Sequence, residues 1–502
     1  MAVLETSEPA AAKPLFSNRY KGVVLSLLLG AYTFNFIDRT IIATIGQAIK
    51  VDMHLTDGQL GLLGGLSFAV LYSLLGVPIA RLAERRSRVT IISVSLVVWS
   101  AFTVACGFAG NFMQLLLMRV GVGVGEAGCT PPAHSLISDY FEPKRRASAL
   151  SIYTLGIPLG SMFGAALGGW LALHFGWRVA FMTVGAPGLI IAILVKTFVK
   201  EPPRGHSDPT EKAVAAVEDP SWMHTEVREI GAVARTLFTS WPVANMILGV
   251  TVTSFAGYGA GFFAPPYFSR AFSLDYATVG LIIGLVAGVS TGIGTIAGGF
   301  VTDWASKHGA AWYSLTPAIG LAIATPIYIS AYNQLTWNGA LLVLLIPGVF
   351  HYTYLAPTFA VVQNVVETRQ RATAAAVLFL FINIIALGGG PVFTGWIIDA
   401  FAQGGFGHPG ETSVFGALGR LMSGAQSGAA QFKSLCPGGA AAHGATAALA
   451  AQCKSTLITA TRQGMIVSVC FYAWGAFHYL LGSFGLARAL QAAAIARKLR
   501  EA

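Results

Sequence analysis

Two pairs of opposite charges interrupt long apolar stretches of this chain. Asp38 and Arg39 are neighbours, whereas Arg119 and Glu126 are seven residues apart, which places them on one face of a helix and two turns apart. A charge at the centre of a lipid-facing helix costs about 2.5–3.5 kcal/mol, so we expect all four to face the interior of a helix bundle. There, burial favours a protonated acid, whereas a nearby arginine favours the carboxylate. Making or breaking an ion pair could therefore couple proton transfer to a change of conformation.

Within this hypothesis we favour Asp38 as the proton carrier, with Glu126 a close second. Arg39 and Arg119 would be their partners or would contact an anionic head group, and the sequence leaves open which acid pairs with which arginine. The alternative is a pair of ion bridges that only fixes the packing of two helices. We consider it the weaker interpretation, because a buried bridge rarely stabilises more than an apolar pair of similar size.

The elements that must position these residues are membrane spans. The chain has 502 residues, of which 54% are hydrophobic and 11% charged, whereas soluble domains average about 25% charged residues. Five cysteines are too few for a disulfide-built secreted domain, and the scattered basic residues form no continuous face for a nucleic acid. Apolar runs of about 20 residues, the length that crosses a bilayer, predict twelve spans in two sets of six. They are expected at residues 22–48, 57–82, 89–108, 112–139, 147–172, 177–199, 242–268, 276–303, 311–331, 337–364, 370–402 and 462–487.

The tails and loops predict the topology. The polar N-terminal residues lead into the first span without a cleavable signal peptide, and with this tail inside, most of the 32 lysines and arginines lie in cytoplasmic segments. We therefore expect an all-α, multi-pass protein of a bacterial inner membrane with both termini in the cytoplasm. Its expected parts are an N-tail (1–21), an N-terminal bundle (22–199), a linker with an amphipathic helix along the inner membrane surface (200–240), a C-terminal bundle (241–487) and a C-tail (488–502).

A segment rich in Gly, Ala and Ser, residues 403–461, interrupts the C-terminal bundle on the outer, periplasmic side. It has too few large apolar residues for a core of its own, so we expect a loosely structured cap or a flexible loop. It contains Cys436 and Cys453, which could form a disulfide there. The other cysteines fall in spans and are expected to be small buried hydrophobic residues, namely Cys106, Cys129 and Cys470.

An internal repeat relates the two sets of spans. EPKRRASA (142–149) matches ETRQRATA (367–374) at an offset of 225, which also pairs Pro132 with Pro357. Two pseudo-symmetric six-helix bundles predict a secondary transporter with its site between the halves. The same offset makes His351 the counterpart of Glu126, as a proton relay or as a packing histidine.

Three motifs resemble a known family. ARLAERRSR (80–88) resembles the signature loop between the second and third helices of the major facilitator superfamily, with Ala80 and Glu84 in place of the usual glycine and aspartate. FIDR (36–39) and RVGVGVGEA (119–127) resemble the Spinster branch of that superfamily, the sphingolipid and lysophospholipid transporter-like proteins.

The resemblance implies alternating access between the two bundles, driven by proton coupling. The implied substrate is amphiphilic, a lysophospholipid or a sphingoid-like lipid, with membrane lipids around the protein. It also implies that the four membrane-embedded charges couple protons and bind substrate. A carrier of small organic anions or drugs also fits two cavity arginines, and a non-transporting receptor or a scramblase would have similar hydropathy.

Further residues are candidates for the cavity and for a gate. Cavity-lining candidates are Tyr32, Asn35, Tyr153, Tyr258, His351, Tyr354, Phe379 and Asn383. In the superfamily, the carboxylate of the signature loop ties the second helix to the start of the eleventh at the cytoplasmic side, although a solvated loop is the alternative. Candidates for this cytoplasmic gate are Glu84, Arg85, Arg88, Asp303, Arg369 and Arg371.

The sequence carries no signature of enzymatic chemistry. It has no G-x-x-x-x-G-K-[ST] loop for ATP, no cysteine and histidine cluster with metal-ligand spacing, and no recognisable nucleophile with a base. We therefore expect a monomeric transporter that is not an enzyme and uses neither a cofactor nor a metal.

Overall fold

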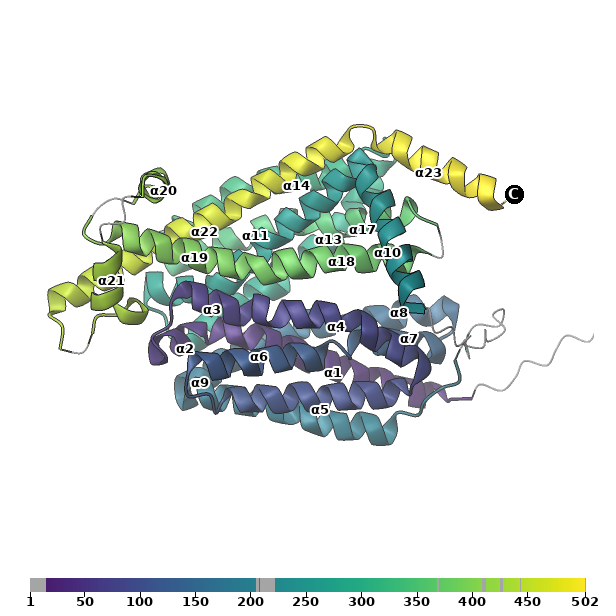
Figure 1. Ribbon diagram of the computed structural model, residues 1–502, viewed down its shortest axis with the longest axis horizontal. Coiled ribbons are helices and arrows are strands. Elements are labelled where there is room, and N and C mark those ends of the chain that lie inside the picture. Colours follow the sequence, from purple (N-terminus) through teal and green to yellow (C-terminus); the bar gives the residue numbers. More distant parts are fainter. Residues whose placement is uncertain are drawn as a thin grey trace, which may run out of the picture.

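The computed structural model describes residues 15–204, 207, 222–367, 370–408, 412–424, 428–442 and 444–501, and its regular elements within these ranges are all helices (Figure 1). Eleven helical segments there are long and apolar enough to cross a membrane. One of them, Ser148–Phe198, has 51 residues and reverses at Gly176, whose φ of +81° lies outside the helical region. Counted as two spans, it gives the twelve crossings that the hydropathy predicts.

The N-terminal half occupies the lower part of Figure 1. Its helices are α1 (Asn18–Thr44), α2 (Gly46–Asp52), α3 (Asp57–Gly64), α4 (Leu66–Arg85), α5 (Arg88–Cys106), α6 (Phe112–Glu126), α7 (Thr130–Tyr140), α8 (Pro143–Thr154) and α9 (Gly156–Phe198). The first part of α9 packs against α1 and the second part against α5, on either side of the reversal.

The C-terminal half occupies the upper part of Figure 1. Its helices are α11 (Trp241–Phe272), α12 (Tyr276–Leu285), α13 (Thr291–Ser306), α14 (Trp312–Tyr332), α15 (Trp337–Leu344), α16 (Pro347–His351), α17 (Leu355–Asn364), α18 (Arg371–Phe381), α19 (Gly389–Gly405), α22 (Ala447–Ser483) and α23 (Leu486–Glu501). The π-helical segments η1 (Val286–Ser290) and η4 (Ile382–Gly388) join α12 to α13 and α18 to α19.

The two halves break corresponding spans at the positions that the repeat pairs. In the N-terminal half, α6 ends at Glu126 and α7 begins at Thr130. In the C-terminal half, α16 ends at His351 and continues as a 3₁₀ turn, η2 (Tyr352–Tyr354). Helix breaks inside a membrane span expose backbone groups and are common at functional sites.

The insertion is more ordered than the sequence suggested. It contains α20 (Val414–Met422), α21 (Ala429–Leu435) and the 3₁₀ turn η5 (Pro437–Gly439), and α22 already begins inside it. Cys436 and Cys453 form a disulfide with their Cα atoms 5.7 Å apart. Short helices, the disulfide and contacts with α19 supply the order that composition did not reveal. Cys470 is exposed, contrary to expectation, because it lies on the outward face of α22.

The linker helix α10 (Trp222–Thr239) packs against the C-terminal half. Val233 and Leu237 are buried, and the ring of Phe238 lies 5.0 Å from that of Phe381 on α18. The helix is amphipathic as predicted, and its apolar face packs against α11 and α18.

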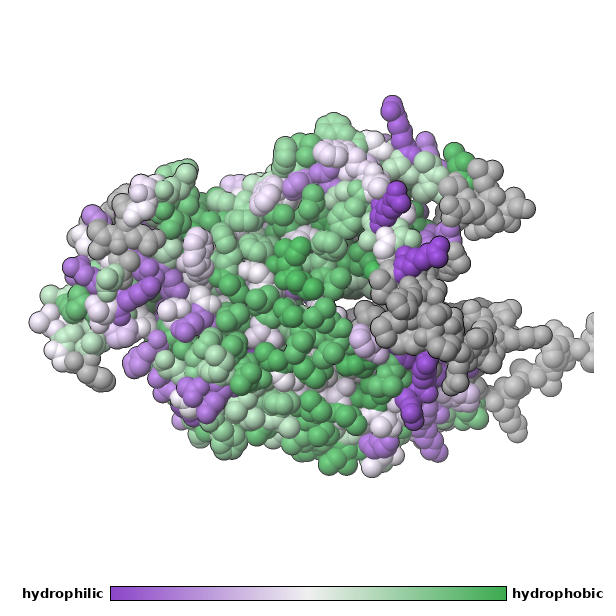
Figure 2. Space-filling view, viewed as in Figure 1, coloured by the Kyte–Doolittle hydropathy of each residue, from purple (hydrophilic) through white to green (hydrophobic). Residues whose placement is uncertain are grey.

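Among the described residues, glycine-lined contacts between the halves lie toward one end. We call the end that carries the insertion the outer end, and the end that carries α23 and the start of α1 the inner end, as the basic residues predict. A Cβ atom on Gly61 would overlap the Pro391 carbonyl, and one on Gly169 would overlap the Tyr276 carbonyl. Toward the inner end, Gly76 has no heavy atom near its would-be Cβ, and Figure 2 shows an indentation between the halves. The structure is therefore closed at the outer end and open at the inner end.

Candidate functional site

The first of the two membrane-embedded ion pairs joins α1 to the last residue of α6. Arg39 Nε lies 2.6 Å from Glu126 Oε2, and the guanidinium is within 5.2 Å of the ring centroids of Phe36, Phe68 and Tyr72. The Glu126 side chain is 0% exposed and that of Arg39 22% exposed. Among the described residues, Glu126 Oε1 has no hydrogen-bond partner. This pair therefore has a free acceptor and a cation that small molecules can reach.

The second pair is sealed. Arg119 Nη1 lies 3.4 Å from Asp38 Oδ2, and the Thr103 hydroxyl donates a 2.9 Å hydrogen bond to Asp38 Oδ1. Both side chains are about 1–2% exposed. This answers the pairing that the sequence left open: Asp38 binds Arg119 in the middle of α6, and Arg39 binds Glu126 at its last residue. The two pairs therefore differ in exposure, because only the Arg39 side chain is partly exposed.

Glycines on α6 bring these charges together. A Cβ on Gly121 would overlap the Phe102 ring, one on Gly123 would approach the Phe68 carbonyl at 2.7 Å, and one on Gly125 would overlap the backbone of Trp99. Small residues let helices approach closely in membranes. Packing against α4 and α5 therefore accounts for the glycine run.

His351 lies in an aromatic cluster of the C-terminal half. Its Nδ1 is 3.3 Å from the Tyr328 hydroxyl, its ring stacks on Tyr354 at 5.5 Å, and Tyr472 lies 4.4 Å from it. The side chain is buried, and its Nε2 has no partner among the described residues. The Tyr354 hydroxyl is 3.1 Å from Ser254 Oγ. His351 and Tyr354 are therefore part of the packed core in this conformation.

The other predicted cavity residues divide by exposure. Tyr258 and Phe379 are exposed, and Tyr32 and Asn383 are partly exposed, which is compatible with a lining role. Asn35 and Tyr153 are buried and line a small pocket together with Tyr32. His351 and Tyr354 are buried in the aromatic cluster just described, so a lining role stays a prediction for these residues. The sequence does not fix how a span is rotated about its own axis, and this rotation decides which of its side chains face a cavity.

Arg88, one of the candidates for the cytoplasmic gate, is buried in an ion-pair cluster of the N-terminal half. The Arg88 guanidinium pairs with Asp139 and, at 2.7 Å from its Nε, with Glu201 Oε1. These partners belong to α7 and to the segment after α9, so the cluster ties the N-terminal half to itself. Burial alone raises the pKa of Glu201, but hydrogen bonds from the Val89 amide, Arg88 and Ser87 hold it below its ordinary value.

For the remaining gate candidates, the latch stays a prediction. Arg85 and Asp303 are exposed and Arg371 is partly exposed. Arg369 lies outside the described residues, as does the side chain of Glu84. The halves are separated at the inner end, so a latch between them there would require another conformation.

Replacing Arg88 by alanine should destabilise the N-terminal half by about 3–5 kcal/mol, because the nearly buried Asp139 would lose its arginine partner. Melting of the purified protein followed by tryptophan fluorescence would measure the change. The Glu201 contribution should be present at pH values above the ordinary pKa of glutamate and vanish as pH falls through its lowered value. An Arg86→Ala variant, at an exposed neighbouring position, is the matched control; equal melting of both variants would contradict the assignment.

Sequence reasoning missed a buried charge cluster at the outer end. Lys50 Nζ lies 2.5 Å from Asp57 Oδ2, and Arg270 from α11 lies 2.5 Å from Asp57 Oδ1. Asp399 on α19 accepts hydrogen bonds from the backbone amides of Asp57 at 2.9 Å and Gly58 at 2.7 Å. Arg270 therefore reaches Asp57 from the opposite half, and the four side chains carry no net charge.

The position of these residues near span ends suggested that water would reach them. Instead the side chains of Lys50, Asp57 and Arg270 are at most 3% exposed, because the other half and the insertion cover them. A Cβ atom on Gly438 of the insertion would lie 3.3 Å from the carbonyl oxygen of Lys50. We call Lys50, Asp57, Arg270 and Asp399 the outer charge cluster.

Comparisons with known proteins agree with this architecture. The sequence model described as Major Facilitator Superfamily matches residues 28–391. A solved structure titled as a bacterial homolog to the human lysosomal transporter Spinster, inward-facing and unoccupied, has a TM-score of 0.77 at 33% identity and covers 95% of this chain and 99% of its own.

Curated relatives carry names of several transport activities. An MFS-type efflux pump of Mycolicibacterium smegmatis is 30% identical over 74% of this chain and 83% of its own length. The sphingosine-1-phosphate transporter SPNS2 of Mus musculus is 26% identical over 74% of this chain and 68% of its own.

Proposed function

The chain belongs to the Major Facilitator Superfamily and is a multi-pass membrane transporter, not an enzyme, and from this premise we propose that it moves an amphiphilic, single-chain lipid such as a lysophospholipid or a sphingoid-like lipid. We further propose that transport is coupled to protons and works by alternating access between the two bundles. The observation that carries the proposal is the unequal pair of ion bridges on α1 and α6.

The Arg39–Glu126 pair has the properties that a coupling site needs. Glu126 has an unpartnered oxygen that can take a proton, and once it is protonated its attraction for Arg39 falls. Arg39 is then free to bind an anionic head group, with aromatic rings beside it for apolar parts of the substrate. We therefore propose Glu126, ahead of Asp38, as the residue that exchanges protons.

The Asp38–Arg119 pair has a supporting role in this proposal. It is closed off on all sides and is held by Thr103, so it keeps α1 and α6 in register while the neighbouring bridge opens. Release of the outer charge cluster would then be required before the halves can open outward. These features support a substrate site between the halves and near the middle of the spans.

A carrier of small organic anions or drugs remains the second candidate, because a relative of similar coverage is named an efflux pump. The same arginine would bind an anion without an alkyl tail. The two candidates differ in what the cavity must accept, which is an alkyl chain in one case and a compact anion in the other.

Counterflow in proteoliposomes distinguishes the two. Vesicles preloaded with an unlabelled lysophospholipid, a sphingoid base or a small organic anion should take up labelled lysophospholipid only in the lipid-loaded cases, with saturation. An imposed pH gradient should then drive net uptake in the absence of counter-substrate. Exchange of organic anions without exchange of either lipid would reject the lipid assignment and favour the second candidate.

A further inference from the structure

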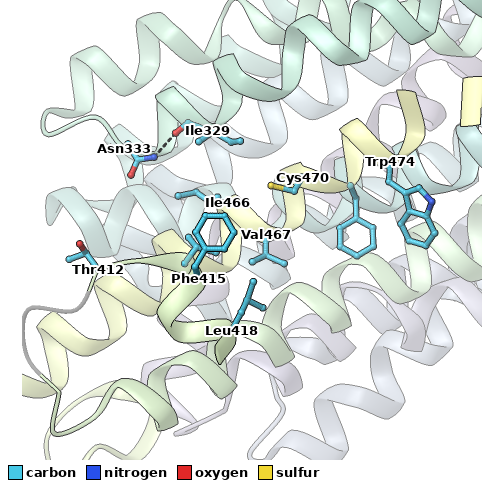
Figure 3. Close-up of a pocket in the computed structure, with 11 residues that line it drawn as sticks. Ile329, Asn333, Thr412, Phe415, Leu418, Ile466, Val467, Cys470 and Trp474 are labelled. Carbon is cyan, nitrogen blue, oxygen red and sulfur yellow. Dashed lines mark hydrogen bonds between the residues drawn. The ribbon is translucent and has the colours of Figure 1, made fainter. Parts of the chain in front are cut away.

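A second feature, far from the ion bridges, is a groove on the membrane-facing side of the C-terminal half. It has a volume of about 580 Å³ and lies along α22 between α14 and the insertion helix α20 (Figure 3). Its walls include Ile466, Val467 and Trp474 of α22, with Phe415 and Leu418 of α20 on the opposite side. It falls within the size range of ligand-binding pockets.

The groove has a direction. Asn333, which follows the outer end of α14, and Thr412, which precedes α20, form its polar end. From there the lining is almost wholly apolar down to Trp474, as the labelled side chains of Figure 3 show. A polar outer end and an apolar interior match the polarity of a lipid that sits in the outer leaflet.

The length of the groove also matches a lipid chain. From Ile466 to Trp474 the helix rises about 12 Å at 1.5 Å per residue. One leaflet of the hydrocarbon core is about 15 Å thick. The groove therefore extends over most of one leaflet, beginning at the outer end of the span.

The insertion provides the roof. The Ser413 carbonyl accepts a 3.1 Å hydrogen bond from the Gln463 side chain, which fixes the start of α20 over α22. Figure 3 shows Phe415 and Leu418 on the side of α20 that faces Ile466 and Val467. The disulfide between Cys436 and Cys453 ties the remainder of the insertion to α22.

We propose that this groove binds one acyl chain of a phospholipid from the outer leaflet, with its head group at the end formed by Asn333 and Thr412. The groove is open at its edge, where Phe415 is 86% exposed, and its almost wholly apolar lining offers water few hydrogen-bond partners. Left empty, the groove would lose van der Waals contacts along its whole length. The bilayer supplies acyl chains at this depth, and the groove requires no transport activity to bind one.

Photocrosslinking tests the proposal. The full-length protein is placed in liposomes containing phosphatidylcholine with a diazirine in the middle of one acyl chain, and the labelled peptides are mapped by mass spectrometry. Label should concentrate on residues 414–418 and 466–474. Val467→Trp, which fills the groove, should cause a several-fold loss at these peptides, whereas Leu480→Trp, on an exposed part of the same helix, should not.

A second filling variant, Leu418→Trp from the roof, gives the same expected loss if Val467→Trp does not fold. Labelling spread over all lipid-facing helices in proportion to exposure, or unchanged by either folded variant, would overturn the proposal. Stronger labelling by a photoreactive lysophospholipid at equal concentration would instead make a single-chain lipid the occupant and overturn the assignment to phospholipid. None of these outcomes depends on whether the protein transports lipids.

Discussion

Glu126→Gln should abolish net substrate uptake driven by a pH gradient while preserving substrate counterflow. Glutamine has the shape of glutamate and can keep a hydrogen bond to Arg39, but it cannot bind and release a proton. Counterflow exchanges substrate for substrate and requires no net proton movement, so the two assays separate coupling from binding. Proteoliposome uptake, with and without an imposed gradient, measures both.

The controls for this prediction are two other acids. Glu142→Gln, at an exposed position preceding α8, should leave driven uptake unchanged. Asp38→Asn should act mainly on folding, because it leaves Arg119 buried without its anion, at a cost of about 3–5 kcal/mol. If Glu126→Gln retained full driven uptake and a well-folded Asp38→Asn lost it, the proton carrier would be Asp38, as the sequence alone favoured.

The inner site shows what sequence can and cannot predict. A charge inside an apolar run is visible without a structure, because its cost in lipid is large, and so Asp38, Arg39, Arg119 and Glu126 were identified from the sequence. Which acid meets which arginine depends on the rotation of α1 relative to α6. The helix breaks at Glu126 and His351 were not predicted, because both positions lie inside apolar runs that read as continuous spans.

The outer end shows the complementary limit. Lys50, Asp57 and Arg270 lie near the ends of spans, where isolated helices would be hydrated. The opposite half and the insertion bury them, so no short stretch of the sequence around these residues indicates their burial. The partners of Arg88 escaped the sequence for the same reason, since Asp139 and Glu201 are 51 and 113 residues away in the chain.

Arg270→Ala should shift the protein from the outward-closed state toward an outward-open one. Arg270 is the member of the outer charge cluster that comes from α11 and binds Asp57 of the other half with two nitrogens, at 2.5 and 3.1 Å. Its removal leaves a net negative charge in a buried interface, and truncating one partner of such a bridge costs about 3–5 kcal/mol. A shift of that size changes the ratio of the two states by roughly a hundredfold or more.

Spin labels at positions 108 and 335, both exposed in loops at the outer ends of different halves, would report the change as a longer distance by pulsed electron resonance. Arg178→Ala is the matched control, because Arg178 and Asp52 form an exposed ion pair at 2.8 Å within one half, and surface pairs contribute at most about 1 kcal/mol. Arg270→Lys should give an intermediate shift, because lysine keeps the charge but cannot bind both Asp57 oxygens in a planar fork. An unchanged distance in a folded Arg270→Ala variant would mean that the glycine contacts alone hold the outer end closed.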